Sequence, residues 1–407
     1  MRLTGQDIVC VSVMDWEHPF ASSRHHLMRA LAARNRVLFV NNQVNPWAVL
    51  GGLRQARGRR ACARRVGLVA NPEPLTAGLW VHTPPWVVPM GQIGRRGLFE
   101  RVYRFNQARL LQDVKQACGR LGFRRPILWI SFNVLSSESL IAGLDPALTV
   151  YHCTDAIAAM PRVSPFAAEI EARLVAQSDL VICSSPALQA AQAARHPACH
   201  LVPNGADVAL FERAQRLTGS RPARLAGVGP GPLLGFAGHL EERLDLPLIT
   251  ELARARPDWQ ILLAGPVAPA VRGALRPLAA LPNVHLIGLV PREELPAILA
   301  ACDALMIPFV HSEQTRAIYP LKLNEYLATG KPVVTTGFAD WPDVGDSLQV
   351  GDGLAGFRAA CERALADTSP ARAAARVALA RANDWEARVQ RIEQLLQERL
   401  FPRASLA

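Results

Sequence analysis

The stretch at residues 232–266, PLLGFAGHLEERLDLPLITELARARPDWQILLAGP, contains two short apolar runs with a helical pattern between them. The runs LLGFAG and QILLAG are almost continuously hydrophobic, as strands covered on both faces are. A strand, a helix and a second strand in this order form a parallel βαβ unit. The stretch therefore predicts a doubly wound α/β sheet.

The same alternation continues on both sides of this stretch. In the first half of the chain the predicted strands are DIVCVSV (7–13), RVLFVNN (36–42), PILWISF (126–132), LTVYHC (148–153) and DLVICS (179–184). In the second half they are the two runs above, VHLIGLV (284–290), ALMIPF (304–309) and PVVTTG (332–337). The alternation breaks near Pro203, so we expect two α/β domains, 1–205 and 206–384, followed by a terminal helix at about 385–407.

Charge is distributed unevenly over the 407 residues. The net charge is +11, and residues 1–200 hold 23 Lys and Arg against 12 Asp and Glu. LRQARGRRACARR (53–65), with six arginines, lies in a segment without acidic residues. Such a cluster attracts an anionic membrane, phosphate-bearing ligands or nucleic acid, unless it is only a solvated loop. Trp80 and Trp86 fit either a membrane interface or a buried loop strand. Nucleic acid is disfavoured, because aromatic residues do not alternate with the arginines.

Several patterns bear on the compartment and on metals. The chain has no run of 18 uncharged apolar residues, and Asp7 and Asp15 interrupt the place of a signal peptide. The eight cysteines are scattered without CxxC. Neither a DxD motif nor a His/Cys cluster occurs. We expect a cytoplasmic protein, peripheral at the inner face of the membrane, with no metal and no cofactor.

The segment PFVHSEQTRAIYPLKLNEYLATGKPVV (308–334) carries the clearest chemistry. A predicted strand ends, a loop follows, and a helix begins near Lys322. A helix N-terminus with a lysine suits a diphosphate, and Glu325, on the same face, suits the two hydroxyls of a ribose. The alternative is a surface ion pair between the two. Gly238, which ends a strand, lets a backbone N–H approach a phosphate, although a tight turn also needs glycine.

Polar residues also follow two strands of the first half. Asp15 follows the first strand, His25 lies at the start of the next helix, and His152 and Asp155 lie at the end of LTVYHC. The carboxyl edge of a doubly wound sheet is where such sites form. His152, Asp155, Asp15 and His25 are our candidate catalytic, acceptor-side residues, with helix capping as the alternative for Asp155.

The pattern PxKxxEYxAxGxPVV resembles the donor-nucleotide segment of the GT-B glycosyltransferases of glycosyltransferase family 4 (group 1). LVICSSPALQAA with HLVPNGADVALF is similar to the crossing between the two domains of that family, and NVHLIGLVPREELPAILAACDALMIPF to its later strands. DWEARVQRIEQLL resembles the helix that returns to the first domain. DWEHPFASSRHHLMRALA and YHCTDAIAAM resemble a branch of the teichuronic-acid and exopolysaccharide type.

This resemblance implies a GT-B fold of two Rossmann-like, doubly wound domains facing across a cleft, with the terminal helix packing back on the first. It implies a retaining, metal-independent enzyme. The donor-binding residues that we predict are Gly238, Lys322, Leu323 and Glu325, with Arg243 or Arg316 in place of the arginine and the lysine that the family usually has. The chain departs from the family at Ala317, where a glutamate is common, and at His239, where an arginine is usual.

The sequence thus predicts a nucleotide-sugar-dependent glycosyltransferase of cell-surface glycan assembly. Its acceptor would be a polysaccharide, a glycolipid or another saccharide, and its N-terminal domain would contact an anionic membrane. The alternatives are a catalytically idle GT-B subunit and a sugar-nucleotide epimerase. A dinucleotide-dependent dehydrogenase is less favoured, because no GxGxxG follows the first strand.

Overall fold

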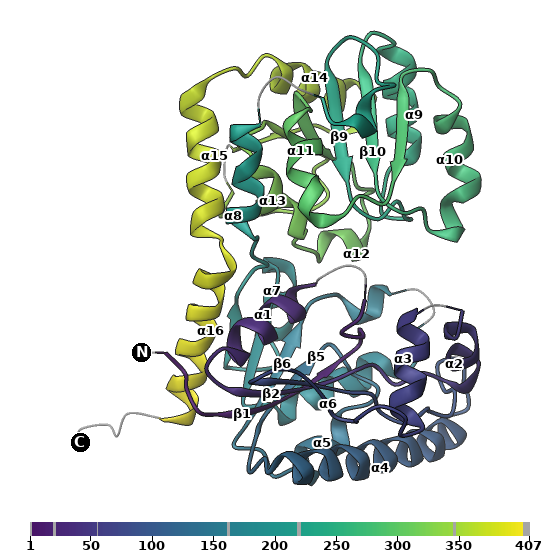
Figure 1. Ribbon diagram of the computed structural model, residues 1–407, viewed down its shortest axis with the longest axis vertical. Helices are drawn as coiled ribbons and strands as arrows, with labels where there is room; N and C mark the ends of the chain where they lie inside the picture. Colours follow the sequence, from purple (N-terminus) through teal and green to yellow (C-terminus); the bar gives the residue numbers. More distant parts are fainter. Residues whose placement is uncertain are drawn as a thin grey trace. The chain divides into compact units, whose positions relative to one another are not determined.

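The structure is a computed structural model that describes residues 2–18, 22–54, 56–160, 163–217, 221–344 and 347–401. The chain folds into two compact units (Figure 1). The first comprises residues 1–203 and 388–407, and the second residues 204–387. In the described part of the chain, no helix combines the length and the apolar character that crossing a membrane requires.

The first unit is built on a sheet with strand order β3-β4-β2-β1-β5-β6-β7-β8. Every neighbouring pair is parallel except β3 with β4. The strands are β1 (Asp7–Ser12), β2 (Arg36–Val40), β3 (Glu73–Thr76), β4 (Leu79–His82), β5 (Ile127–Ser131), β6 (Leu148–Cys153), β7 (Leu180–Cys183) and β8 (Cys199–Leu201). The helices are α1 (Ser23–Ala32), α2 (Pro46–Gly52), α3 (Ala56–Arg65), α4 (Arg96–Leu121), α5 (Glu138–Gly143), α6 (Ala167–Gln177) and α7 (Pro186–Ala193).

The second unit has an all-parallel sheet of order β11-β10-β9-β12-β13-β14. The strands are β9 (Leu233–Ala237), β10 (Gln260–Ala264), β11 (Val284–Gly288), β12 (Ala304–Ile307), β13 (Val333–Thr335) and β14 (Leu348–Val350). The helices are α8 (Val208–Phe211), α9 (Leu246–Ala255), α10 (Arg272–Ala279), α11 (Leu295–Ala300), α12 (Glu313–Arg316), α13 (Leu321–Ala328), α14 (Gly353–Leu365) and α15 (Pro370–Ala382). Helix α16 (Trp385–Leu400) begins in this unit and continues into the first.

Burial explains why the central strands are parallel and apolar. Every residue of β5, β6, β9, β10 and β12 is buried, because helices cover both faces of each sheet (Figure 1). The predicted doubly wound α/β fold is confirmed. Strands β3, β8 and β14 were not predicted, since these short, partly exposed edge strands lack a continuous apolar run.

Each sheet reverses its strand order next to its first strand. In the first unit the chain moves outward from β1 to β2 and then returns to β5 on the other side; in the second it moves from β9 to β10 and returns to β12. Doubly wound sheets bind ligands beyond the carboxyl ends of the strands at these reversal points. The fold therefore indicates one binding region above β1 and β5 and another above β9 and β12.

Candidate active site

Two glycines shape the carboxyl ends of β9 and β10. Gly238 follows β9 with φ +153°, and Gly265 follows β10 with φ +149°, conformations that other residues rarely adopt. A Cβ atom on Gly265 would lie 1.8 Å from the carbonyl oxygen of Gly238, and one on Gly238 would lie 2.5 Å from Lys322 Nζ. The absence of both side chains therefore allows the backbone and the lysine ammonium to come close together.

Lys322 lies in the first turn of α13 and reaches the reversal point of the second sheet. Its Nζ lies 4.1 Å from the ring centre of Phe236 in β9 and 5.0 Å from that of Phe309, which follows β12. In the described part of the chain, no carboxylate forms an ion pair with it. Burial, assisted by the charge of Arg243, lowers the pKa of Lys322 to about 7. The site thus holds a poorly neutralised cation beside a glycine loop.

Glu325 lies three residues later and is held by an arginine that sequence reasoning missed. Nη1 of Arg292 donates to Oε1 of Glu325 at 3.0 Å, and the Arg292 guanidinium lies over the ring of Phe211 at 5.4 Å. Arg292 Nη2 is buried and has no hydrogen-bond partner among the described residues. Only the stretch PREEL hinted at this residue, which lies 33 positions before Glu325. Glu325 therefore pairs with Arg292, and not with Lys322 as the surface ion-pair alternative required.

The remaining predicted donor residues are placed differently from one another. Arg243 pairs with Glu241 and lies over the ring of Phe309 at 5.7 Å, close enough to Lys322 to influence it electrostatically. Leu323 is fully buried in the apolar core, and its N–H donates to the carbonyl of Pro320. Arg316 ends α12 with an exposed side chain that contacts none of the other predicted donor residues in the described chain. The geometry therefore gathers Gly238, Arg243, Lys322 and Glu325.

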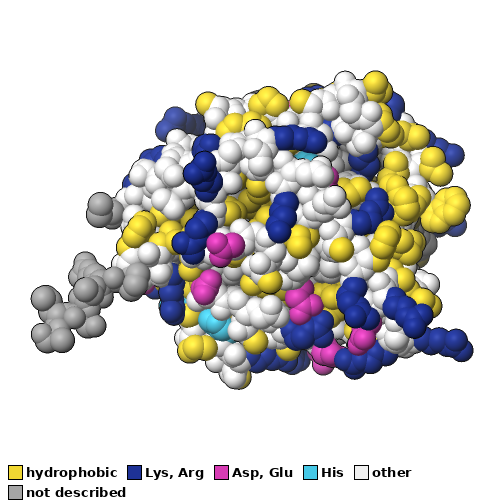
Figure 2. Space-filling view, turned by 90° about the horizontal axis from the view of Figure 1, so that it is seen from below, with side chains coloured by type: hydrophobic (Ala, Val, Ile, Leu, Met, Phe, Trp, Pro, Cys, Tyr) yellow, Lys and Arg dark blue, Asp and Glu magenta, His cyan; other side chains and the backbone are white. Residues whose placement is uncertain are grey.

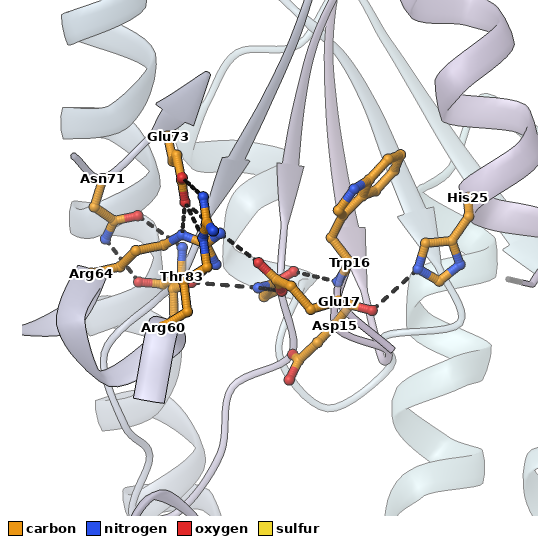
Figure 3. A network of polar contacts seen from close by, with 10 residues as sticks. Asp15, Trp16, Glu17, His25, Arg60, Arg64, Asn71, Glu73 and Thr83 are labelled. Carbon is orange, nitrogen blue, oxygen red and sulfur yellow. Dashed lines mark hydrogen bonds and ion pairs between the residues drawn. The ribbon is translucent and has the colours of Figure 1, made fainter. Parts of the chain in front are cut away.

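A loop after β1 carries Asp15 and is fixed by its neighbours (Figure 3). Oδ1 of Asp15 accepts the N–H of Asn42 at 3.2 Å, and the Trp16 N–H donates to Oδ1 of Asn41 at 2.8 Å. Nε2 of His25 donates to the Asp15 carbonyl at 3.1 Å. These contacts place Asp15 beyond the carboxyl end of β1.

His25 uses both ring nitrogens to hold the chain. Its Nδ1 accepts the backbone N–H of Ser22 at 3.1 Å while Nε2 contacts the Asp15 carbonyl, which fixes a neutral ring with the proton on Nε2. Burial lowers the pKa of His25 to about 4. Stacking on Phe39 and tilted contact with Trp16 complete its surroundings. In this geometry His25 orders the loop that carries Asp15.

His152 and Asp155 lie at the carboxyl end of β6, two strands from β1. His152 is buried at 2% exposure in a T-shaped contact with Trp129, and burial lowers its pKa to about 3. Asp155 is half-buried and accepts the hydroxyl of Thr154 at 3.1 Å. Because the carboxyl ends of parallel strands meet at one edge, both residues share the edge of the first sheet with Asp15.

Part of the arginine cluster is internally neutralised (Figure 3). Arg64 is 2% exposed and forms ion pairs with Glu17 and Glu73, and Arg60 pairs with Glu73 as well. The Arg60 and Arg64 pairs lower the pKa of Glu73. These two arginines therefore fix α3 to β3. Any unpaired positive charge on the surface must come from the other arginines of the cluster.

The residues described by the structure contain no group of three or more His, Cys, Asp or Glu side chains arranged to hold a metal ion. The eight cysteines are free thiols. The predicted donor region thus offers cations and a helix N-terminus as ligands for an anion, whereas the N–H groups of Gly238 and Gly265 donate to the carbonyls of Ala264 and Gly288.

The chain is similar to proteins of a known family. The family model described as glycosyl transferases group 1 matches residues 231–367, which contain the predicted donor residues. The putative teichuronic acid biosynthesis glycosyltransferase TuaH of Bacillus subtilis is 31% identical over 282 residues, covering 65% of this chain and 69% of that protein.

Solved structures agree in fold. A UDP-forming α,α-trehalose-phosphate synthase from Burkholderia vietnamiensis has a TM-score of 0.72 at 14% identity, covering 100% of both chains. Anabaena Alr3699/HepE, solved in complex with UDP, has a TM-score of 0.65 at 16% identity, covering 97% of this chain and 100% of that one. At such identities the likeness concerns the fold alone. From the TuaH match and the family model together, the chain belongs to the group 1 glycosyl transferases.

Proposed function

We propose that this glycosyltransferase takes its sugar from a nucleoside-diphosphate donor bound in the second unit and adds it to a cell-surface glycan. The observation that carries the proposal is the Lys322 ammonium, half-buried beside Gly238 without a carboxylate partner in the described chain. A diphosphate supplies the missing negative charge. TuaH and the UDP complex of HepE support a nucleotide-sugar donor and a surface-glycan product.

The proposed donor residues each contact a different part of the nucleotide sugar. The diphosphate lies at the N-terminus of α13, where free N–H groups and Lys322 meet its charge. Glu325, held by Arg292, accepts hydrogen bonds from the ribose hydroxyls. Arg243 adds positive charge near Phe309, while Arg316 and Leu323 remain predicted donor residues. As the bond to the sugar breaks, these groups stabilise the departing nucleoside diphosphate.

The acceptor lies in the first unit, along the carboxyl edge of its sheet. Asp15 and Asp155 accept hydrogen bonds from acceptor hydroxyls, and His152 is neutral and shares the acceptor proton. His25 acts by holding the Asp15 loop. The reaction is of the retaining type, which does not require a protein base.

The test of this function is a panel of UDP-, GDP-, ADP- and TDP-sugars, measured by thermal unfolding and by release of nucleoside diphosphate. A true donor at 100 times its dissociation constant raises the free energy of unfolding by about 2.7 kcal/mol. Turnover identifies the transferase. An idle subunit would bind without releasing the diphosphate, and an epimerase would convert the sugar without an acceptor.

Donor binding is expected to take up a proton above pH 7. Lys322 has a pKa of about 7 in the free protein, and a bound diphosphate raises it. Below pH 7 the lysine is already charged, so affinity does not change with pH on its account. Above pH 7 binding must protonate it, and the affinity falls by up to about tenfold per pH unit. Calorimetry of donor binding at pH 8 in two buffers of different ionisation enthalpy measures how many protons are taken up. If no proton were taken up, Lys322 would not be the group that meets the diphosphate.

Transfer is expected to be independent of metal ions. We propose this because cations of the chain and the α13 N-terminus are available to meet the charge of the leaving group. Activity in excess EDTA should equal that in its absence. Complete loss on chelation, with recovery in manganese or magnesium, would refute the expectation.

We further propose that the first unit rests on anionic lipid at the inner face of the membrane. Helix α2 has no buried residue, and Trp47 and Leu50 are 75% and 58% exposed. Arg54 and Arg59 are exposed nearby, while the side chain of Arg57 lies outside the described part. Figure 2 shows hydrophobic and basic side chains together on the side where Figure 1 places α2. Apolar and cationic groups together suit a lipid surface.

Arg54→Gln with Arg59→Gln should weaken binding to anionic liposomes about 30-fold at low salt, since each such cation contributes about 1 kcal/mol. Trp47→Ala should weaken it further. The matched control is Arg104→Gln, an exposed arginine on α4. Arg64 is unsuitable for this test because it is buried in ion pairs. Binding that ignores lipid charge, salt and the double substitution would show that the cluster is a solvated loop.

A further inference from the structure

Buried arginines in this chain are of two kinds. Arg24, Arg64 and Arg376 are at most 5% exposed in the described structure. Arg64 lies between two glutamates, and Arg376 binds Asp367 at 2.8 Å. Arg24 differs, because its direct hydrogen bonds go to hydroxyl groups. A buried charge is normally paired with an opposite charge, so Arg24 stands out as lacking a directly bound counter-ion.

The contacts of Arg24 show where such a counter-ion fits. Nε donates to the Ser131 hydroxyl at 3.0 Å, and Nη2 donates to the Thr154 hydroxyl at 3.3 Å. Within the described chain, Nη1 has no hydrogen-bond partner. Burial lowers the pKa of Arg24, and the nearby charge of Asp155 opposes that effect. The Thr154 hydroxyl donates to Asp155, and thus links the carboxylate to the guanidinium indirectly.

His152 supplies a second group without a partner. Its Nδ1 is fully buried and makes no hydrogen bond with any described residue. Parallel pairing sets His152 directly beside Ser131, the residue that holds Arg24. The neutral ring carries one N–H donor and one acceptor nitrogen. Since a buried imidazole with an unused nitrogen is costly, both side chains indicate a missing ligand.

The position in the fold agrees with a binding site. Ser131 ends β5, which neighbours β1 at the reversal point of the first sheet. Arg24 lies in the first turn of α1, whose N-terminus adds positive potential. An anion bound there would meet the guanidinium, the imidazole and the helix terminus together.

We propose that Arg24 and His152 form an oxyanion-binding site that takes a phosphate or carboxylate group of the acceptor. The oxyanion accepts from Nη1 of Arg24 and from the ring N–H of His152, which turns the guanidinium into a paired charge. The acceptor is then a sugar phosphate or a sugar acid, and not a neutral saccharide. The proposal rests on the proposed function only in identifying the bound anion as part of the acceptor.

The experiment titrates the full chain with inorganic phosphate, glucuronate and glucose at constant ionic strength, followed by calorimetry. Phosphate also suits the donor site, so these titrations use the Lys322→Met background. Phosphate or glucuronate should bind, and glucose should bind at least tenfold more weakly. Tighter phosphate binding identifies a sugar phosphate, and tighter glucuronate binding a sugar acid. If glucose bound as tightly as the anions, the proposal would be overturned. It would also be overturned if the bound anion were an adventitious ion only, with an affinity that does not depend on Arg24.

Arg24→Gln should lower the oxyanion affinity at least tenfold, and Arg24→Lys should restore part of it. The matched control is Arg34→Gln, an exposed arginine just beyond the other end of α1, which should bind as the parent does. If Arg24→Gln does not fold, His152→Gln gives the same comparison, since this ring makes no hydrogen bond that the variant would lose. Unchanged affinity in His152→Gln would overturn the site.

The oxyanion site of the first unit and the proposed binding of a sugar nucleotide in the second unit can be refuted independently of each other. With Lys322 intact, Arg24→Gln should bind sugar nucleotides as tightly as the parent chain, because the donor lies in the second unit. Oxyanion binding without any sugar-nucleotide binding would refute the proposed donor and leave this site standing. If Arg24→Gln turned over the donor and bound the acceptor as tightly as the parent chain, only the oxyanion site would be refuted.

Discussion

Lys322→Met is expected to lower donor turnover by about 10²–10³-fold, equivalent to about 2.7–4 kcal/mol of transition-state stabilisation. The methionine fills similar space between Phe236 and Phe309 but carries no charge. Lys322 forms no ion pair in the described chain, so its charge is available to neutralise the diphosphate of the proposed donor. Steady-state release of nucleoside diphosphate and calorimetric donor affinity measure the loss.

The same variant is expected to be at least as stable as the parent. In the folded protein the pKa of Lys322 is about 7, below its usual 10.5, so the charged form is disfavoured by folding. This cost is fully present below pH 7 and fades as the pH rises toward 10.5, because the unfolded chain binds more protons in that window. Thermal unfolding should therefore show a larger advantage for Lys322→Met at pH 6 than at pH 9. A structural lysine would give the opposite result, a loss of stability.

Gly265→Ala is expected to destabilise the second unit and to abolish donor binding. Its φ of +149° costs about 1–3 kcal/mol for a residue with a side chain. The added Cβ would also lie 1.8 Å from the carbonyl oxygen of Gly238, so the glycine loop of the proposed donor site must move. Denaturant unfolding and donor titration measure the two effects.

Gly273→Ala is the matched control for this substitution. Gly273 is exposed in α10, and a Cβ there would meet nothing within 4 Å. Because alanine favours a helix over glycine, this variant should gain about 0.5–1 kcal/mol. Parent-like donor affinity in Gly265→Ala would show that the position of the glycine loop does not matter for binding.

The sequence predicted the central strands well because each is a continuous apolar run, and through Lys322 and Glu325 it indicated the segment that we propose binds the donor. It did not reveal Arg292, which contacts Glu325 from 33 positions away and lies among other charged residues. Pairings over such distances depend on the fold, which a local pattern does not contain.

The arginine cluster shows the same limit. Six arginines in one segment predict a uniformly basic surface, but Arg60 and Arg64 are occupied by Glu73, which lies outside that segment. Arg24 shows the reverse case. In the sequence, Arg24 is one basic residue beside His25 at the start of a predicted helix. Only the structure shows that it is buried against Ser131 of β5 without a directly bound carboxylate.

We propose that the second unit binds the diphosphate of a nucleotide sugar beside Gly238 and Lys322. Crystals soaked with the sugar nucleotide that gives the largest thermal shift in the panel test it most directly. We expect a diphosphate oxygen within about 3 Å of Lys322 Nζ and the ribose hydroxyls at hydrogen-bond distance from Glu325. A nucleotide bound in this crystal with its diphosphate away from Lys322 and its ribose away from Glu325 would contradict the account.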